Sequence, residues 1–319
     1  MTNSGWGWRR CALAAVAGAA TWLAGCGGGE PIERFVARRL IVLGDETSVV
    51  NNDGSKYSVN ALVAPDNLLF DCKANPLWVQ ILANFYGLTL AQCPNGSAPV
   101  TVLMLAAAGA QVSSISAQID SVGGFVEKDL VTLLAGANDI FNQYALVAAN
   151  PQSEPAAIAV VRAAGEALAA QVNRIANSGG KVLISTVPDL SLTPFALSED
   201  ALTPGRAALL KRLTAEFNAR LRINIINDGR RIGLLLTDGT VQLVARNPAF
   251  AGLANAKDAA CTAGLGPTSC TTLTLAHPPA PAASATAGSY LWATDRLFSS
   301  GGHSLLGSLA LTRATGNPF

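Results

Sequence analysis

The sequence predicts an α/β fold of three layers, in which helices cover both faces of a central parallel sheet. Two observations predict it. Short apolar runs alternate with helical patterns along the chain, which is the order of a parallel sheet with crossover helices. Half of the 319 residues are apolar and only 13% are charged, which is enough apolar material for a large core. We expect one domain over residues 39–319.

Five apolar runs are expected to form the sheet. Each is apolar nearly throughout, as a parallel strand buried on both faces should be. A tight turn, a Gly-Ala-Asn-Asp segment and a proline follow the first, third and fourth runs respectively. The predicted strands cover residues 40–43, 100–105, 129–135, 181–187 and 232–236.

Helical patterns lie between these runs. Apolar residues at steps of three and four predict helices over 76–86, 113–122 and 157–175, and Gly179-Gly180 is expected to end the third. Thr203-Pro204 predicts the start of a further helix, with threonine as N-cap and proline at the first helical position. Residues 51–99 are largely irregular, 262–289 should form a loop, and 290–312 should carry a last helix.

The N-terminus has the pattern of an export signal. Arg9-Arg10 precedes an apolar run from Ala12 to Ala24, which is shorter than the ~20 residues of a membrane span. The run ends in Leu23-Ala-Gly-Cys26, which resembles a bacterial lipobox. This resemblance implies a signal peptide over 1–25, a lipid on Cys26, a tether over 26–38, and sorting to the outer membrane because Gly27 follows. The alternative is plain secretion with a chance cysteine.

Charge and cysteine content limit the possible partners and compartment. The formal net charge is +1, and removal of residues 1–25 takes away Arg9 and Arg10 and no acid, which makes it −1. Nucleic acid is therefore not an expected partner. An even number of cysteines after Cys26 is typical of disulfides in an exported protein. Three pairings are possible, and we favour the one with the smallest loops, which joins Cys72 to Cys93 and Cys261 to Cys270.

Four sequence blocks resemble those of the GDSL, or SGNH, hydrolases, which attack esters with a serine. This resemblance implies the three-layer, flavodoxin-like fold of that family for nearly the whole mature chain. The blocks are Leu43-Gly-Asp-Glu-Thr-Ser48; Ala106–Ala110 with Ile115–Ile119; Leu134-Ala-Gly-Ala-Asn-Asp139; and a last region with Asn247–Phe250, Ala260-Cys261 and Tyr290–Ala293.

The resemblance also implies roles for single residues. Gly109 and Asn138 match the glycine N–H and asparagine that stabilise the oxyanion in the family. Their structural alternatives are a turn at Gly109 and a helix cap at Asn138. The catalytic serine, aspartate and histidine fall on Glu46, Thr294 and Leu297. A carboxylate only accepts hydrogen bonds and would repel an oxyanion.

Two other arrangements could supply a reaction. A rebuilt ester-hydrolase site would use Ser48 with His303 and Asp295, although Ser48 is more typical of a capping serine. The other histidine, His277, lies in a proline-rich stretch. A carboxylate-based or metal-dependent site would use Asp45, Glu46 and Asp139, but their spacing matches no metal motif, and we expect no metal or cofactor.

The sequence therefore predicts a lipid-anchored member of the family whose triad has been lost. Its partners would be the membrane, through Cys26, and a small-molecule, glycan or protein ligand in the old cleft. An active carboxylic ester hydrolase is the alternative.

Overall fold

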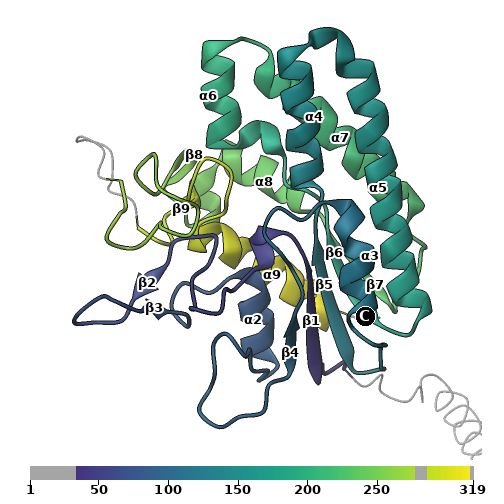
Figure 1. The fold of residues 1–319 in the computed structure, drawn as a ribbon, viewed down its shortest axis with the longest axis vertical. Coiled ribbons are helices and arrows are strands. Elements are labelled where there is room, and N and C mark those ends of the chain that lie inside the picture. The colour runs from purple at the N-terminus through teal and green to yellow at the C-terminus, as the bar shows by residue number, and fades with distance from the viewer. Residues whose placement is uncertain (1–33, 277–285, 317–319) are drawn as a thin grey trace, which may run out of the picture. The chain divides into compact units, whose positions relative to one another are not determined.

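The carboxyl ends of five parallel strands form one edge of the central sheet (Figure 1). This computed structural model describes residues 34–276 and 286–316, so the predicted signal peptide, Cys26, His277 and most of the tether lie outside the described residues. The strand order is β4-β1-β5-β6-β7. The strands are β1 (Arg39–Gly44), β4 (Val102–Met104), β5 (Asp129–Leu134), β6 (Lys181–Ser185) and β7 (Ile232–Leu235).

Side chains of these strands alternate between two cores, one on each face. Ile41 and Leu43 of β1 join the core that α3, α5 and α7 cover, whereas Leu40 and Val42 join the core under α2, α8 and α9. A strand side chain points to alternate faces, so both faces must be apolar to be buried. This confirms the predicted three-layer α/β/α fold.

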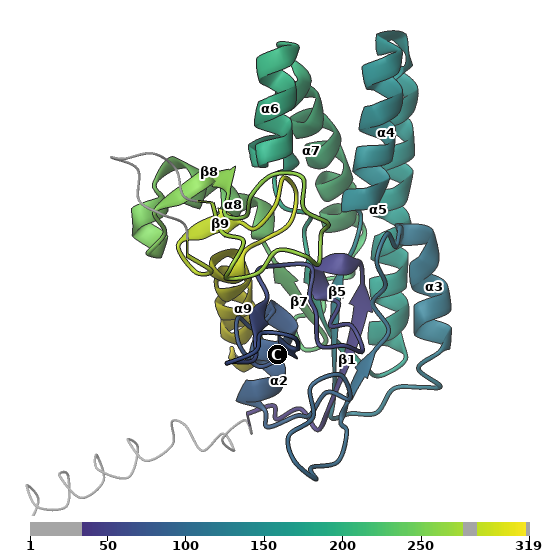
Figure 2. The same ribbon diagram turned by 60° about the vertical axis from the view of Figure 1, so that its left-hand side comes forward.

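The predicted helices are present, and the described residues also contain three helices outside the predicted ranges, at 137–149, 194–202 and 237–246. Figure 2 shows that α4 and α6 extend beyond the carboxyl edge of the sheet. The helices are α2 (Trp78–Phe85), α3 (Val112–Asp120), α4 (Ala137–Ala149), α5 (Glu154–Asn177), α6 (Pro194–Leu202), α7 (Arg206–Asn224), α8 (Thr237–Arg246) and α9 (Ser300–Thr315).

Short elements connect and flank these helices. Two small pairs of strands lie outside the central sheet, β2 (Ala61–Leu62) with β3 (Phe70–Asp71) and β8 (Asn255–Ala259) with β9 (Tyr290–Trp292). Single 3-10 turns are η1 (Glu46–Ser48), η2 (Pro151–Ser153), η3 (Leu190–Leu192) and η4 (Pro248–Ala251).

One predicted helix start was wrong. Thr203 lies at the end of α6, and Gly205 precedes α7. The Thr-Pro start signal occurs twice, and it is Thr193 that caps a helix, because its hydroxyl accepts a hydrogen bond from the Ala196 N–H at 3.2 Å. The local signal is the same at both places, so the sequence could not tell which pair begins a helix.

The helical stretch Pro151–Asn177, which contains α5, is long and apolar enough to cross a membrane by length and composition alone. In this structure Val161, Leu168, Val172 and Ile175 are fully buried in the core under α5. Burial of this apolar face accounts for the composition of α5, because helices that pack in a protein core are similarly apolar.

Two disulfides join Cys72 to Cys93 and Cys261 to Cys270, with Cα–Cα distances of 5.7 and 5.8 Å. The predicted pairing is confirmed. Disulfides persist in oxidising compartments, so they indicate an exported protein.

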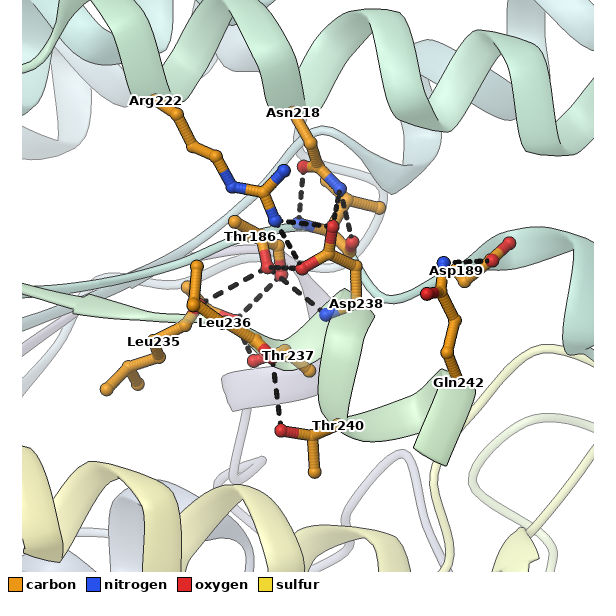
Figure 3. A network of polar contacts seen from close by, with 12 residues as sticks. Thr186, Asp189, Asn218, Arg222, Leu235, Leu236, Thr237, Asp238, Thr240 and Gln242 are labelled. Atoms are coloured by element: carbon orange, nitrogen blue, oxygen red, sulfur yellow. Dashed lines mark hydrogen bonds and ion pairs between the residues drawn. The ribbon is translucent and has the colours of Figure 1, made fainter. Parts of the chain in front are cut away.

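A polar network fixes the loop after β6 (Figure 3). Asp238 at the start of α8 accepts hydrogen bonds from Arg222 at 2.6 Å and from the Thr186 hydroxyl at 2.8 Å. Asn218 of α7 bonds both the N–H and the C=O of Val187, at 3.0 and 2.8 Å. The network anchors the chain just before Pro188 and Leu190, which line the cavity described below.

Candidate functional site

The site lies where the strand order reverses. β4 and β5 lie on opposite sides of β1, and crevices at such points are the usual ligand sites of open parallel sheets. Three segments that follow these strands converge there. They contribute Glu46 after β1, Gly109 after β4 and Asn138 in the first turn of α4.

The turn after β1 is held from two sides. Gly44 has φ +122°, and a Cβ on it would lie 2.0 Å from the Leu134 carbonyl oxygen of β5. Only glycine permits this approach. The Gln118 side chain of α3 bonds both the N–H and the C=O of Gly44, at 2.8 and 3.0 Å. The position of Glu46 is therefore set by the sheet itself.

The Glu46 carboxylate occupies the place between the two residues that match the oxyanion donors. Its Oε2 accepts the Gly109 N–H at 2.9 Å and the Asn138 Nδ2 at 3.0 Å. The Asn138 Nδ2 also donates a hydrogen bond to the Ala110 carbonyl at 3.1 Å. Within the described residues, no donor bonds the other carboxylate oxygen, Oε1.

Asp45 is fully buried beside Glu46. One of its oxygens accepts the Thr47 N–H at 3.0 Å, and the other has no partner among the described residues. Burial, with a further contribution from the charge of Glu46, raises the pKa of Asp45 to about 8. Asp45 therefore keeps its proton to a higher pH than a free aspartic acid does.

Asp139, the third carboxylate of the predicted cluster, accepts the Val112 N–H at 3.0 Å, and burial raises its pKa. In residues 34–276 and 286–316, no group of three or more His, Cys, Asp and Glu side chains could hold a metal ion. The described geometry therefore gives the carboxylate-metal hypothesis no support.

A cavity of about 370 Å³ lies beside these residues, and Glu46, Gly109 and Asn138 form the part of its lining that we call the floor. Glu46, Gly109, Asn138, Thr294 and Leu297 all line it, although they come from four segments that are far apart in the sequence. Leu265 and Pro267 line it too, so the stretch after Cys261 covers part of the cleft. The remaining lining residues are Thr47, Tyr57, Ala108, Leu134, Ala137, Phe141, Pro188, Leu190, Asp295, Arg296 and Phe298.

In the turn that carries Thr294 and Leu297, the two positions that match the family's aspartate and histidine hold neither an acid nor a base. The Thr294 hydroxyl accepts the Leu297 N–H at 3.3 Å, and the Leu297 side chain is apolar and half-buried. Asp295 is exposed, with its side chain 61% accessible, and pairs with Arg296 at 3.5 Å.

Arg296 is held at the cavity by two aromatic rings. Its guanidinium carbon lies 3.9 Å from the Phe195 ring centroid and 4.4 Å from that of Phe141. Such stacking is attractive and restricts the side chain. No signal in the sequence pointed to Arg296, because its partners come from α4 and α6.

The structure does not join Ser48 to His303. The Ser48 hydroxyl accepts the Trp78 indole N–H at 3.1 Å, and His303 Nδ1 accepts the Trp78 backbone N–H at 3.4 Å. His303 is fully buried, and its Nε2 has no partner among the described residues. Burial lowers the pKa of His303 to about 3, with a contribution from Lys56. Neither Ser48 nor His303 lines the cavity.

Fold and site together define a three-layer α/β/α protein with its cleft at the carboxyl end of β1. The model of the GDSL-like lipase/acylhydrolase family matches residues 41–289. The chain belongs to that family, as its sequence blocks predict.

Solved structures resemble the chain only distantly. An α/β-hydrolase enzyme from the metagenome of Lake Arreo is 15% identical, with 90% of this chain and 98% of that chain covered and a TM-score of 0.43. An acetylxylan esterase from Geobacillus stearothermophilus is 12% identical, with 88% and 95% covered and a TM-score of 0.43. A protein of Parabacteroides merdae described as a GDSL-like lipase is 12% identical, with 90% and 99% covered and a TM-score of 0.40. No curated protein sequence gives a significant match.

Proposed function

We propose that this chain is a GDSL-family protein that binds a ligand in the cleft and no longer hydrolyses esters. The observation that carries the proposal is the pair of hydrogen bonds from Gly109 and Asn138 to Glu46. An ester carbonyl needs those donors free, because they stabilise the negative oxygen of the tetrahedral intermediate. Here they hold a carboxylate, which would repel that oxygen.

The absence of an acid and a base at the two matching triad positions supports the same proposal. Thr294 and Leu297 line the cavity at the positions that match the family's aspartate and histidine. A hydroxyl and an isobutyl group cannot take a proton from a nucleophile at neutral pH. The alternative, an active carboxylic ester hydrolase using Ser48, His303 and Asp295, would need a Ser48–His303 hydrogen bond, whereas each of these two side chains accepts a hydrogen bond from Trp78 and neither lines the cavity.

The proposed location is the outer membrane, on its periplasmic or surface side, with the protein held by a lipid on Cys26. The two disulfides support an exported protein. Metabolic labelling with a clickable palmitate should mark the wild-type chain, and Cys26→Ser should abolish the label. An unlabelled wild-type chain would contradict the anchor.

The activity test uses the mature chain with Cys26→Ser, which carries no lipid. p-Nitrophenyl acetate and butyrate should be hydrolysed no faster than background, and Ser48→Ala and His303→Ala should leave that rate unchanged. Far-UV circular dichroism controls for folding. Turnover that disappears in both variants would establish the rebuilt triad and overturn the proposal.

A further inference from the structure

We infer that the cavity selects a ligand with a primary ammonium group and an apolar body, and that the ammonium binds Oε1 of Glu46. The inference rests on the proposed ligand-binding function and adds the chemical class of the ligand. It follows from the hydrogen-bonding capacity of the cavity floor, from its walls and from the charges at its opening.

The donors of the floor are fully used. Gly109 has one backbone N–H, and it bonds Glu46. Asn138 has two amide hydrogens, and its Nδ2 bonds both Glu46 and the Ala110 carbonyl. Neither residue has a hydrogen left for a ligand. A carbonyl, carboxylate or phosphate oxygen that reached the floor would therefore find no donor from this pair.

What the floor offers is an acceptor. An ionised carboxylate has two oxygens and accepts only, and Oε2 is committed to Gly109 and Asn138. Oε1 has no donor among the described residues, and Glu46 lines the cavity. The two hydrogen bonds from Gly109 and Asn138 fix the direction of the carboxylate. The floor therefore presents an acceptor to a ligand, whereas an oxyanion site presents donors.

A cationic donor fits that acceptor better than a neutral one. A hydroxyl and an ammonium would both donate to an ionised acceptor, but only the ammonium adds the Coulomb attraction between opposite charges. The neighbouring acid, Asp45, is buried beneath the turn and is not in the cavity lining. Glu46 is thus the charge that a ligand meets at the floor, and an ammonium is preferred to a hydroxyl.

The walls define the rest of the ligand. They are mainly apolar, and Leu134, Phe141, Pro188, Leu190, Leu265 and Leu297 contribute to them. The volume of about 370 Å³ lies within the range of small-molecule sites, on the order of 300–1,000 Å³. An alkyl or aryl chain attached to the ammonium would bury its surface against these residues.

The charges at the opening do not oppose a cation strongly. Arg296 lines the cavity, but it is stacked between Phe141 and Phe195 and pairs with Asp295. Both members of the pair are substantially exposed, with side chains 41% and 61% accessible, so solvent screens them. The pair is neutral overall, and the net charge of the cavity lining comes from Glu46.

Three matched six-carbon probes test the inference: n-hexylammonium, 1-hexanol and hexanoate. Binding to the mature Cys26→Ser chain would be measured by titration calorimetry at pH 7 and low ionic strength. Hexylammonium should bind at least about tenfold more tightly than hexanol, and hexanoate should show no binding. Glu46→Gln keeps the shape and removes the charge, and it should lower only the ammonium affinity, by about tenfold. Glu46→Ser frees both donors and should gain binding of hexanoate.

A control separates the local charge from the net charge. Glu166→Gln on α5 removes the same charge from an exposed pair with Arg220 of α7 and should leave all three affinities unchanged. Equal binding of all three probes, or an ammonium affinity that is unchanged in Glu46→Gln, would overturn the inference and leave cleft binding intact. Failure of every probe to bind would overturn the inference as well. Ester turnover in the wild-type chain together with a retained ammonium preference would overturn only the proposed function.

Discussion

Glu46 and Asn138 are joined by a hydrogen bond of 3.0 Å between Oε2 and Nδ2, across the point where β1 and β5 end. The two residues come from turns that are 92 positions apart. The bond places a carboxylate against two groups that match the oxyanion donors of the family. Because this bond contributes to the stability of the folded protein, its loss can be followed by unfolding as well as by activity.

Asn138→Asp should destabilise the fold by about 1–3 kcal/mol. Two carboxylates would then face each other at hydrogen-bond distance, and the donor to Glu46 would be lost. Asn138→Ser, which is smaller and uncharged, should cost less. Urea unfolding followed by circular dichroism measures both. A stability of Asn138→Asp equal to that of wild type would show that the bond contributes nothing.

Two glycines with positive φ should respond very differently to alanine. A Cβ on Gly44 would lie 2.0 Å from the Leu134 carbonyl oxygen, whereas a Cβ on Gly109 has nothing within 4 Å. Gly109→Ala should therefore cost only the backbone strain of its φ, about 1 kcal/mol. Gly44→Ala should cost more than about 4 kcal/mol or prevent folding. Similar midpoints of thermal unfolding for the two variants would contradict this difference.

The stability of the protein should fall between pH 6.5 and 8. The pKa of Asp45 is raised from 3.8 to about 8, so above pH 4 the unfolded chain releases a proton that the native chain keeps. This favours unfolding by up to about 1.4 kcal/mol per pH unit. His303, with its pKa lowered from 6.5 to about 3, has the opposite slope below pH 6.5. Lys56, with its pKa lowered from 10.5 to about 8, makes stability rise again as the pH increases beyond 8.

The variant Asp45→Asn isolates this effect. It removes the titrating group, so the urea midpoint should no longer decrease from pH 6.5 to 8, whereas that of wild type should decrease. Below pH 6.5, where the Asp45 slope no longer offsets that of His303, the variant should lose stability more steeply than wild type. A wild-type midpoint that rises from pH 6.5 to 8 would contradict the assigned direction for Asp45.

The fold was largely predictable because its strands are short apolar runs and its long helices carry apolar stripes. The failures have local causes. Thr193-Pro194 and Thr203-Pro204 carry the same start signal, and only packing distinguishes them. The helix α4 was suggested only by the possible cap at Asn138, and no range was predicted for it, although Ile140, Tyr144 and Val147 recur at helical steps.

The site was predictable only through the family resemblance. Spacing alone could not place Glu46 beside Gly109 and Asn138, because the strand order brings them together. The saturation of both donors could not be predicted, since it depends on the direction of one carboxylate. The stacking of Arg296 between Phe141 and Phe195 also depends on tertiary contacts, and no motif contains the three residues.

Ester hydrolysis should return only when nucleophile, base and orienting acid are all supplied. Glu46→Ser alone frees the two donors but leaves Thr294 and Leu297, so p-nitrophenyl butyrate turnover should stay near background. The triple variant Glu46→Ser, Thr294→Asp, Leu297→His places all three groups around the same cavity. Because loss of a triad costs about a millionfold, even an imperfect geometry should give about 100-fold over background. The control adds Ser48→Ala, which should change nothing. Activity in Glu46→Ser alone would instead show that a base reaches this cavity from elsewhere in the chain.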